Sequence, residues 1–311
     1  MKYIRDTLEF HNDKPSVITM GKFDGLHRGH DLLMEHLLET GNEQHLYKIV
    51  FTFDIPPKSR VFGEDSYVLT TNEEKRFVFE RTGIDCLIEC PFDERVMHME
   101  PEEFIAWIVN SLHAKYFVCG RDFHFGHNRA GDYRVLQSFE EKYGYKTIVL
   151  DKVQEDERDI SSTFVREQIS LGNMEKANHL LGYSFFIRSR VVHGNQIGRK
   201  MGIPTINMIL PPEKLLPPYG VYVTRVLIGE NSYKGVSNVG CKPTIEGDNP
   251  VGVETFILDF CQDVYEEEIM VEFLHYVRPE KRFDSLEELK QQISSDIAFS
   301  ERYYRNVTKM C

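Results

Sequence analysis

The hydrophobic pattern of this chain changes once along its length, near residues 182–184. In the first half, apolar runs of strand length alternate with segments whose apolar residues recur at helical spacing. The strand-like runs lie at 16–21, 46–53, 84–90, 115–120 and 145–151. This alternation predicts an α/β domain in which helices flank both faces of a parallel sheet.

Local signals support the helices between these strands. Thr71 and Glu74 have the spacing of a capping box, in which each side chain binds the backbone amide of the other residue. Pro101 stands where a helix tolerates proline, in its first turn. We expect helices at 29–41, 71–81, 101–113 and 132–143.

The second half is rich in β-branched and aromatic residues, with Gly, Pro and Asn between the runs. Its strand-like runs lie at 184–194, 219–229, 231–240, 251–260 and 267–277. They predict a small antiparallel β-barrel, followed by an amphipathic helix at 285–304. Residues 163–181 are expected to form one or two short helices ending at Gly182. The expected domains are therefore 1–182 and 183–311.

The chain of 311 residues carries a formal net charge of −12. A general nucleic-acid binder needs a basic face, so this charge argues against that class. No run approaches the roughly 20 apolar residues that span a bilayer, and the mixed, charged start does not resemble a signal peptide. We expect a cytoplasmic protein, not bound to membranes, whose six cysteines are reduced.

The segment after the first predicted strand suits a polyphosphate. Residues 21–30 read GKFDGLHRGH, and their glycines let the backbone turn tightly just before a helix begins. The helix start presents free N–H groups, and His27 and His30 add side-chain donors, so we expect both histidines to act in catalysis. Such a site holds charge in position and needs no protein nucleophile. The expected nucleotide contacts are Gly21, Phe23, Asp24, Gly25 and Gly29.

A second predicted helix start offers three hydroxyl groups followed by a basic residue. Its residues are Ser161, Ser162, Thr163 and Arg166. Taken alone, the hydroxyls are more typical of a helix cap. Together with the histidine turn, they favour a second contact with the nucleotide phosphates.

The His-x-Gly-His turn and the Ser-Ser-Thr-x-x-Arg segment resemble the nucleotidylyltransferase superfamily. Residues 119–131, CGRDFHFGHNRAG, are similar to the FMN adenylyltransferase domain of bacterial bifunctional riboflavin kinase/FAD synthetases. The resemblance implies a Rossmann-like domain with a flavin-nucleotide site in this segment. The site residues implied are Asp122, Phe123, Phe125 and Arg129. A metal site on His124 and His127 is a less favoured alternative, because the motif has no acidic or cysteine partner suitably placed.

Residues 193–207, HGNQIGRKMGIPTIN, carry the chemistry of the second half. Glycines and basic residues there suit a phosphate chain, and the absence of a Walker A sequence excludes an ordinary P-loop. The residues concerned are Gly194, Gly198, Arg199, Lys200 and Gly202. Thr205 and Asn207 supply oxygen ligands that suit Mg²⁺, and their spacing puts both on one side of an extended segment.

Phosphoryl transfer to a hydroxyl also needs a carboxylate that orients or deprotonates the hydroxyl. Glu254, inside the apolar run VGVETFILDF, is the candidate. Strand alternation alone leaves open a second interpretation, in which Glu254 simply faces solvent.

The pattern Gly-Arg-x-x-Gly-x-Pro-Thr-x-Asn resembles the riboflavin kinase signature, and GVSNVG at 235–240, Pro243-Thr244 and Glu254 continue it in order. The resemblance implies that the threonine and asparagine bind Mg²⁺-nucleotide and that Glu254 is the base for the ribityl 5′-hydroxyl. Arg278 and Phe283 match a later region of that family, and Arg278 is expected at the flavin.

Three positions depart from the family pattern. The family usually has Phe-x-Pro-His-Pro after its second strand, whereas residues 53–57 read FDIPP, with Pro56 at the histidine position. The family's Thr-Ala-Asn is Thr205-Ile206-Asn207, which keeps both ligands, and a usual glycine is Ser189. Only the first departure concerns an activity, adenylylation, and Lys22, Lys58 or Arg60 could replace the missing phosphate contact.

We therefore expect two ATP-dependent reactions, with Mg²⁺ as cofactor and riboflavin, FMN and FAD as substrates and products. One alternative is a riboflavin kinase whose first domain is weakened or inactive. Another is a flavin-binding regulator without turnover. The sequence gives no expectation for the oligomeric state.

Overall fold

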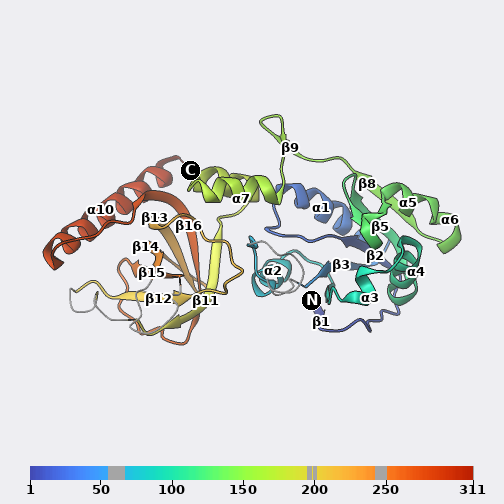
Figure 1. The fold of residues 1–311 in the computed structure, drawn as a ribbon, viewed down its shortest axis with the longest axis horizontal. Helices are drawn as coiled ribbons and strands as arrows, with labels where there is room; N and C mark the ends of the chain where they lie inside the picture. Colours follow the sequence, from blue (N-terminus) through green and yellow to red (C-terminus); the bar gives the residue numbers. More distant parts are fainter. Residues whose placement is uncertain (55–66, 195–197, 199–201, 242–250, 311) are drawn as a thin grey trace. The chain divides into compact units, whose positions relative to one another are not determined.

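The fold comes from a computed structural model that describes residues 1–54, 67–194, 198, 202–241 and 251–310. The chain divides into two compact units, Met1–Ser162 and Thr163–Cys311. Figure 1 shows an α/β arrangement in the first unit and a β-barrel in the second. Both predicted classes of fold are confirmed.

The first unit is built on one six-stranded sheet in which every neighbouring pair is parallel. In spatial order its strands are β1 (Lys2–Arg5), β4 (Cys86–Cys90), β3 (Tyr47–Phe53), β2 (Ser16–Met20), β5 (Ala114–Gly120) and β8 (Lys146–Leu150). The edge strand β1 was not expected from the sequence. It has only four residues and no apolar alternation, so its extended conformation depends on pairing with β4.

Helices connect these strands as expected. They are α1 (Arg28–Glu43), α2 (Asn72–Phe79), α3 (Glu94–Met97), α4 (Pro101–Leu112), α5 (Tyr133–Ser138) and α6 (Glu140–Tyr143). The capping box is confirmed, because Thr71 Oγ1 accepts from the Glu74 amide at 3.2 Å and Glu74 Oε2 accepts from the Thr71 amide at 2.9 Å. The single helix expected at 132–143 is two helices, since Phe139 has the non-helical angles φ −103° and ψ 5°.

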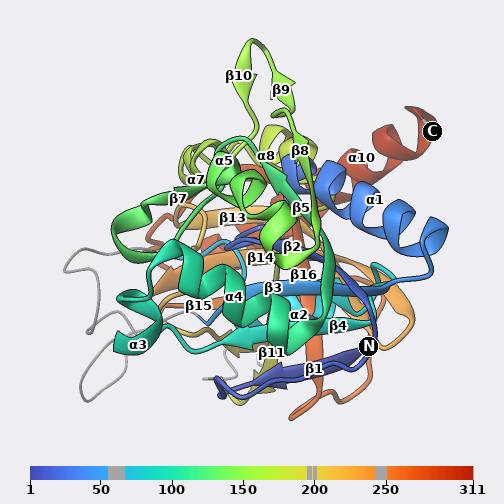
Figure 2. The same cartoon turned by 90° about the vertical axis from the view of Figure 1, so that its right-hand side faces the viewer.

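Short pieces complete the first unit. They are β6 (His124–Phe125), the 3-10 helix η1 (His127–Arg129), β7 (Gly131–Asp132), β9 (Gln154–Glu155) and β10 (Arg158–Asp159). The last two form a hairpin that projects from the unit (Figure 2).

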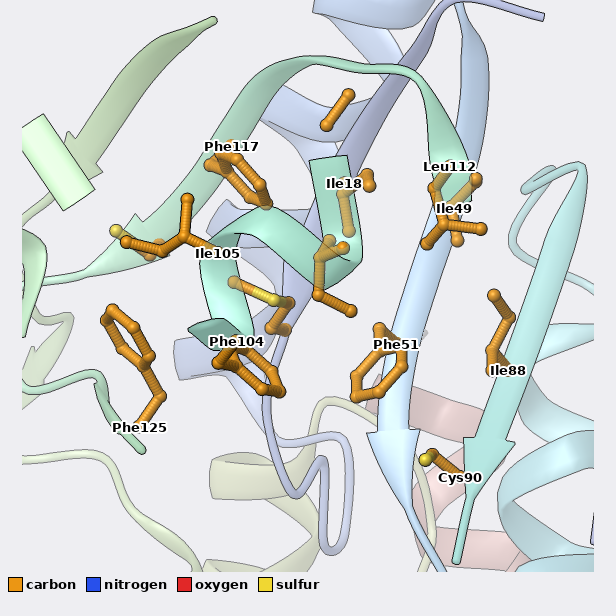
Figure 3. Packing of buried hydrophobic residues seen from close by; sticks show 14 of the residues in the cluster. Ile18, Ile49, Phe51, Ile88, Cys90, Phe104, Ile105, Leu112, Phe117 and Phe125 are labelled. Carbon is orange, nitrogen blue, oxygen red and sulfur yellow. The ribbon is translucent and has the colours of Figure 1, made fainter. Parts of the chain in front are cut away.

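The two faces of the sheet differ in chemistry. On the face covered by α4, Ile18, Ile49, Phe51 and Ile88 pack against Phe104 and other buried apolar residues (Figure 3). On the opposite face, strand alternation places the apolar Val17, Val50 and Leu87 and, nearer the carboxyl ends of the strands, the polar Thr19, Thr52 and Glu89, all with 2% or less of their surface exposed. Burying such polar groups costs free energy unless they are hydrogen-bonded or paired.

The second unit is a closed barrel of antiparallel strands, as expected. In order around the barrel they are β11 (Phe186–Val192), β12 (Thr205–Ile209), β15 (Val251–Ile257), β14 (Asn231–Cys241), β13 (Gly220–Ile228) and β16 (Glu268–Pro279). At β12 the sequence predicts only an extended segment. The terminal helix α10 (Leu286–Met310) places Ile297 against a small apolar cluster of Val221, Val236 and Leu258.

Two helices precede the barrel, α7 (Ser162–Ser170) and α8 (Met174–Leu181), and the second ends at Gly182 in a left-handed conformation. Asn178 on α8 forms hydrogen bonds with the barrel unit on both sides of its amide. Its Nδ2 donates to the Phe273 carbonyl at 2.8 Å, and its Oδ1 accepts from the Phe185 amide at 2.7 Å. The boundary between the compact units lies at 162/163, before the domain boundary expected at 182/183. The expected boundary between the two functional domains stays a prediction.

Candidate active sites

Distant segments hold the turn that follows β2. Asp24 Oδ1 accepts hydrogen bonds from the backbone amides of Leu69, at 2.8 Å, and Thr70, at 3.1 Å. Ser162 Oγ donates to the Asp24 carbonyl oxygen at 2.8 Å. Gly25 has a φ of 83°, which favours glycine, and its amide donates to Thr70 Oγ1 at 3.1 Å. Asp24, expected at the nucleotide, thus uses one carboxylate oxygen to fix the shape of the turn.

Two other residues expected at the nucleotide also support the turn. The Phe23 ring is fully buried and lies 5.6 Å from the Phe79 ring and 5.2 Å from the His30 ring, measured between centroids. The Gly21 amide donates to the Phe51 carbonyl at 3.1 Å. Phe23 therefore links α2, which carries Phe79, to α1, which carries His30.

The two motif histidines stack against each other at the start of α1. His27 is the N-cap residue, and its ring centroid lies 3.9 Å from that of His30. Gly29 permits this packing, because a Cβ there would come within 3.0 Å of the His27 ring and 3.1 Å of the Ile160 carbonyl oxygen. Burial, helped by His27 and Lys75, lowers the pKa of His30 well below its usual value. His30 is therefore neutral at pH 7 and can offer one ring N–H.

A buried ion pair near this turn was missed from the sequence. Lys75 on α2 and Glu89 on β4 are each 2% exposed, with Nζ and Oε1 4.0 Å apart. The Tyr3 hydroxyl donates to Glu89 Oε2. Glu89 lies inside the apolar run IDCLIEC, which is the signal that marked Glu254, so the same reasoning could have found it.

The predicted Ser-Ser-Thr-x-x-Arg element spans the boundary between the units. Ser161 and Ser162 end the first unit, and Ser162 reaches the histidine turn through Asp24. Thr163 and Arg166 lie on α7 in the second unit. The phosphate-binding role of this element stays a prediction.

The flavin segment expected at 119–131 has both buried and exposed members. Phe125 is buried, 5.5 Å from the Phe104 ring, and stacks on Phe123 at 5.4 Å. Asp122 is exposed and forms an ion pair of 3.3 Å with Lys152. Arg129 is exposed, with a left-handed φ of 59°. Phe123, Asp122 and Arg129 are thus nearer the surface than Phe125, which belongs to the core.

The two histidines of this segment bind backbone oxygens. His124 Nδ1 contacts the Asp122 carbonyl at 2.7 Å, and His127 Nδ1 contacts the Met97 carbonyl at 3.1 Å. Among residues 1–54, 67–194, 198, 202–241 and 251–310, no group of three or more His, Cys, Asp or Glu is arranged to hold a metal ion.

In the barrel, strand register brings three polar residues into one row. Glu254 on β15 pairs directly with Asn207 on β12 and with Asn238 on β14. Laterally paired residues point to the same face of a sheet, so two amides flank the carboxylate. Thr205 lies two residues before Asn207 and shares its face. Asn238 was not among the expected site residues, although it stands in the GVSNVG segment.

The expected glycine-rich loop approaches this row closely. A Cβ at Gly194 would lie 2.4 Å from Asn207 Nδ2, so only glycine leaves the amide in place. Gly198 accepts through its carbonyl from the Ile203 amide at 2.9 Å, and Gly202 has a left-handed φ of 78°. Arg199, Lys200, Pro243 and Thr244 lie outside the described residues.

Arg278, expected at the flavin, is bound to the terminal helix. Its guanidinium makes a two-pronged contact with Asp296 on α10, with Nε–Oδ1 at 3.0 Å and Nη2–Oδ2 at 2.7 Å. The central carbon of the guanidinium lies 6.0 Å from the centroid of the Phe283 ring. The adjacent Glu280 accepts from Asn238 Nδ2 at 3.1 Å, which links this region to the row around Glu254.

Comparison with known proteins finds the same two-part organisation. The FAD synthetase family model matches residues 9–164, and the riboflavin kinase family model matches residues 181–304. A bifunctional riboflavin kinase/FMN adenylyltransferase of Escherichia coli (strain K12) is 36% identical over 292 residues, which are 93% of this chain and 92% of that protein. This chain belongs to the bifunctional riboflavin kinase/FMN adenylyltransferase family.

Two further proteins are similar to this chain over nearly its whole length. The family member of Bacillus subtilis (strain 168) is 33% identical, with 94% of each chain covered. A solved structure from Streptococcus pneumoniae, described as a macrolide-efflux protein, has 29% identity and a TM-score of 0.86, covering 97% of this chain and 99% of its own. In the part of this chain that the structure describes, no helix is long and apolar enough to cross a membrane.

Proposed function

We propose that this protein makes flavin cofactors in two steps, one in each unit. Riboflavin and ATP give FMN and ADP at the barrel, and FMN and ATP give FAD and pyrophosphate at the α/β unit. The observation that carries the proposal is the match of two family models, in order, to regions that each contain a set of polar residues brought together by the fold.

For the kinase step, Glu254 acts as the base. The riboflavin 5′-oxygen bonds to the γ-phosphorus as the bond to the β-phosphate oxygen breaks, and the hydroxyl proton passes to the Glu254 carboxylate. Asn207 and Asn238, which flank Glu254, orient the reacting groups.

Thr205 and Asn207 are the proposed ligands of Mg²⁺. Both offer neutral oxygen donors of the kind the ion prefers, from one side of β12 beside the glycine loop. When bound, the ion neutralises charge on the phosphate oxygens of ATP. Gly194, Gly198, Arg199 and Gly202 are the proposed phosphate contacts, and Arg278 supports the flavin end of the site.

For the adenylylation step, no protein nucleophile is needed. An FMN phosphate oxygen bonds to the α-phosphorus of ATP, and pyrophosphate leaves with the oxygen that bridged the α- and β-phosphates. We propose that ring N–H groups of His27 and His30 and the positive dipole end at the start of α1 stabilise the charge on the phosphates. The segment from Asp122 to Arg129 is the proposed flavin site, and Ser161, Ser162, Thr163 and Arg166 are proposed further phosphate contacts.

The substrates are small molecules, and we propose that the protein works in the cytoplasm without nucleic acid. Purified full-length protein should convert riboflavin with Mg-ATP to FMN, and FMN with Mg-ATP to FAD, when products are separated by chromatography. FMN as the sole product would favour a protein with a single activity. Flavin binding without either product would favour a regulator and contradict the proposal.

A further inference from the structure

The first unit holds a buried charged pair that the expected motifs do not account for. Lys75 and Glu89 form this pair, and each is 2% exposed. Their separation of 4.0 Å is longer than a hydrogen bond. Within the described residues, Glu89 Oε1 accepts no hydrogen bond. Its interaction with Lys75 Nζ is therefore electrostatic, without a hydrogen bond.

Other buried polar atoms lie on β2 and at the start of α1. Thr19 Oγ1 on β2 and His30 Nδ1 on α1 also have no hydrogen-bond partner in the described part of the chain. Buried polar groups are nearly always satisfied, and an exception points to a ligand, a water or a functional role. Three such atoms, on β2, β4 and α1, favour a functional role.

Lys75 is positioned toward the histidine turn by its helix. Lys75 and Phe79 are four residues apart on α2 and are both buried, so they share the inward face. Phe79 contacts Phe23, which contacts His30. Asp24, within the turn, accepts hydrogen bonds from the amides of Leu69 and Thr70 just before α2.

Carboxylates near Lys75 come from β4 and from the segments that follow β2 and β3. Glu89 on β4, Asp24 after β2 and Asp54 after β3 all favour its ammonium form, and burial opposes it, so the pKa of Lys75 lies below its usual value. Burial raises the pKa of Glu89, while Tyr3 and Lys75 oppose that rise. The Lys75 charge also lowers the pKa of His30.

We propose that Lys75 is a positioning residue for adenylyl transfer, which supplies a fixed positive charge next to His30 and is held there by Glu89. This inference rests on the proposed function of the first unit. A fixed charge in a site with little water stabilises developing negative charge on phosphate without reorganisation. It also offers positive potential in a chain whose formal net charge is −12.

The test compares three variants of the full-length protein. Lys75→Met removes the charge at similar length, the double variant Lys75→Met/Glu89→Gln removes both charges, and Lys115→Met is the control on an exposed lysine of β5. Removing one partner of a buried pair destabilises a protein, whereas removing both can be close to neutral. The double variant therefore shows whether a loss of activity comes from a loss of stability or from the loss of the Lys75 charge.

We expect Lys75→Met to lower kcat for FAD formation from FMN by roughly 10²-fold. The double variant should regain thermal stability while FAD formation stays low, and Lys115→Met should match the wild type. FMN formation from riboflavin should be unchanged in all three. Recovery of FAD formation together with stability in the double variant would make the pair merely structural and overturn the proposal.

A second readout does not depend on turnover. The NMR titration of His30, assigned with His30→Gln, should move toward higher pH in Lys75→Met because a nearby positive charge has been removed. If the wild type makes no FAD from FMN, the proposed function of the first unit fails and the inference falls with it; if the wild type does make FAD, the variants and the titration test the inference by itself. A His30 titration that is the same with and without Lys75 would overturn it.

Discussion

The two candidate sites are assembled in different ways. In the barrel, strand register alone aligns Asn207, Glu254 and Asn238 on neighbouring strands. In the α/β unit, the histidine turn is held by residues far away in sequence, such as Thr70 and Ser162. The barrel site is therefore sensitive to local spacing and close packing, whereas the histidine site depends on the folding of the whole unit.

The largest effect is expected at the barrel. Glu254→Gln keeps the shape of the side chain but removes the proton acceptor, so FMN formation should fall by roughly 10²–10⁴-fold. FAD formation from supplied FMN should be unchanged, as measured by chromatography of both products. Glu230→Gln, on an exposed turn of the same unit, is the matched control. A kinase rate for Glu254→Gln equal to that of the control would remove Glu254 from its assigned role.

Two fragments test whether the barrel needs α7 and α8 for its stability. A fragment of residues 183–311 loses α7 and α8, and with them the Asn178 hydrogen bonds to Phe185 and Phe273. Each buried partner left unsatisfied costs roughly 1–3 kcal/mol. The fragment 163–311 should therefore unfold at higher denaturant concentration, and both fragments should phosphorylate riboflavin wherever they are folded.

Asn178→Ala in the longer fragment is the control for this comparison, because it removes the same hydrogen bonds while keeping both helices. It should lie between the two fragments in stability. Equal stability of 163–311 and 183–311 would show that the functional boundary expected at 182/183 is also the structural one.

Close packing at the glycine loop gives a smaller effect. In Gly194→Ala the new methyl group would overlap Asn207 and must displace its amide. Misplacement of a ligand by about 1 Å can cost up to about 10²-fold in rate, so we expect FMN formation to fall by roughly 10-fold or more. The KM for Mg-ATP should rise, and FAD formation from FMN should stay the same. An unchanged KM would show that the backbone of the loop moves to accommodate the methyl group and that the Asn207 amide stays in place.

The smallest effect concerns the stability of the first unit below neutral pH. The pKa of His30 is lower in the folded than in the unfolded protein, so the unfolded state takes up a proton first as the pH falls. The first unit should lose about 1.4 kcal/mol of stability per pH unit below about 6.5, until the folded pKa is reached. His30→Gln should remove this part of the pH dependence, and an unaltered slope in denaturant unfolding would contradict the burial of His30.

The same contrast explains what the sequence could predict. Strand and helix periodicity, the Thr71 capping box and the motif around Thr205 and Asn207 are local patterns, and the structure has the expected elements there. Lys75 and Glu89 were missed because their meeting depends on the packing of α2 against β4. Strand β1 was missed for the same reason, since its four residues become a strand only beside β4. Residues 55–66, with Pro56, Lys58 and Arg60, lie outside the described part, and Lys22 is exposed.

The central claim is that two sites work independently, one in each unit, and His30→Gln tests it most directly beside Glu254→Gln. Each variant is given riboflavin with Mg-ATP and, separately, FMN with Mg-ATP, and both products are quantified. We predict that His30→Gln forms FMN at the wild-type rate while FAD formation falls by about 10²–10³-fold, the usual cost of one positioned donor, and that Glu254→Gln shows the reverse. A parallel loss of both products in a folded His30→Gln protein would contradict the account.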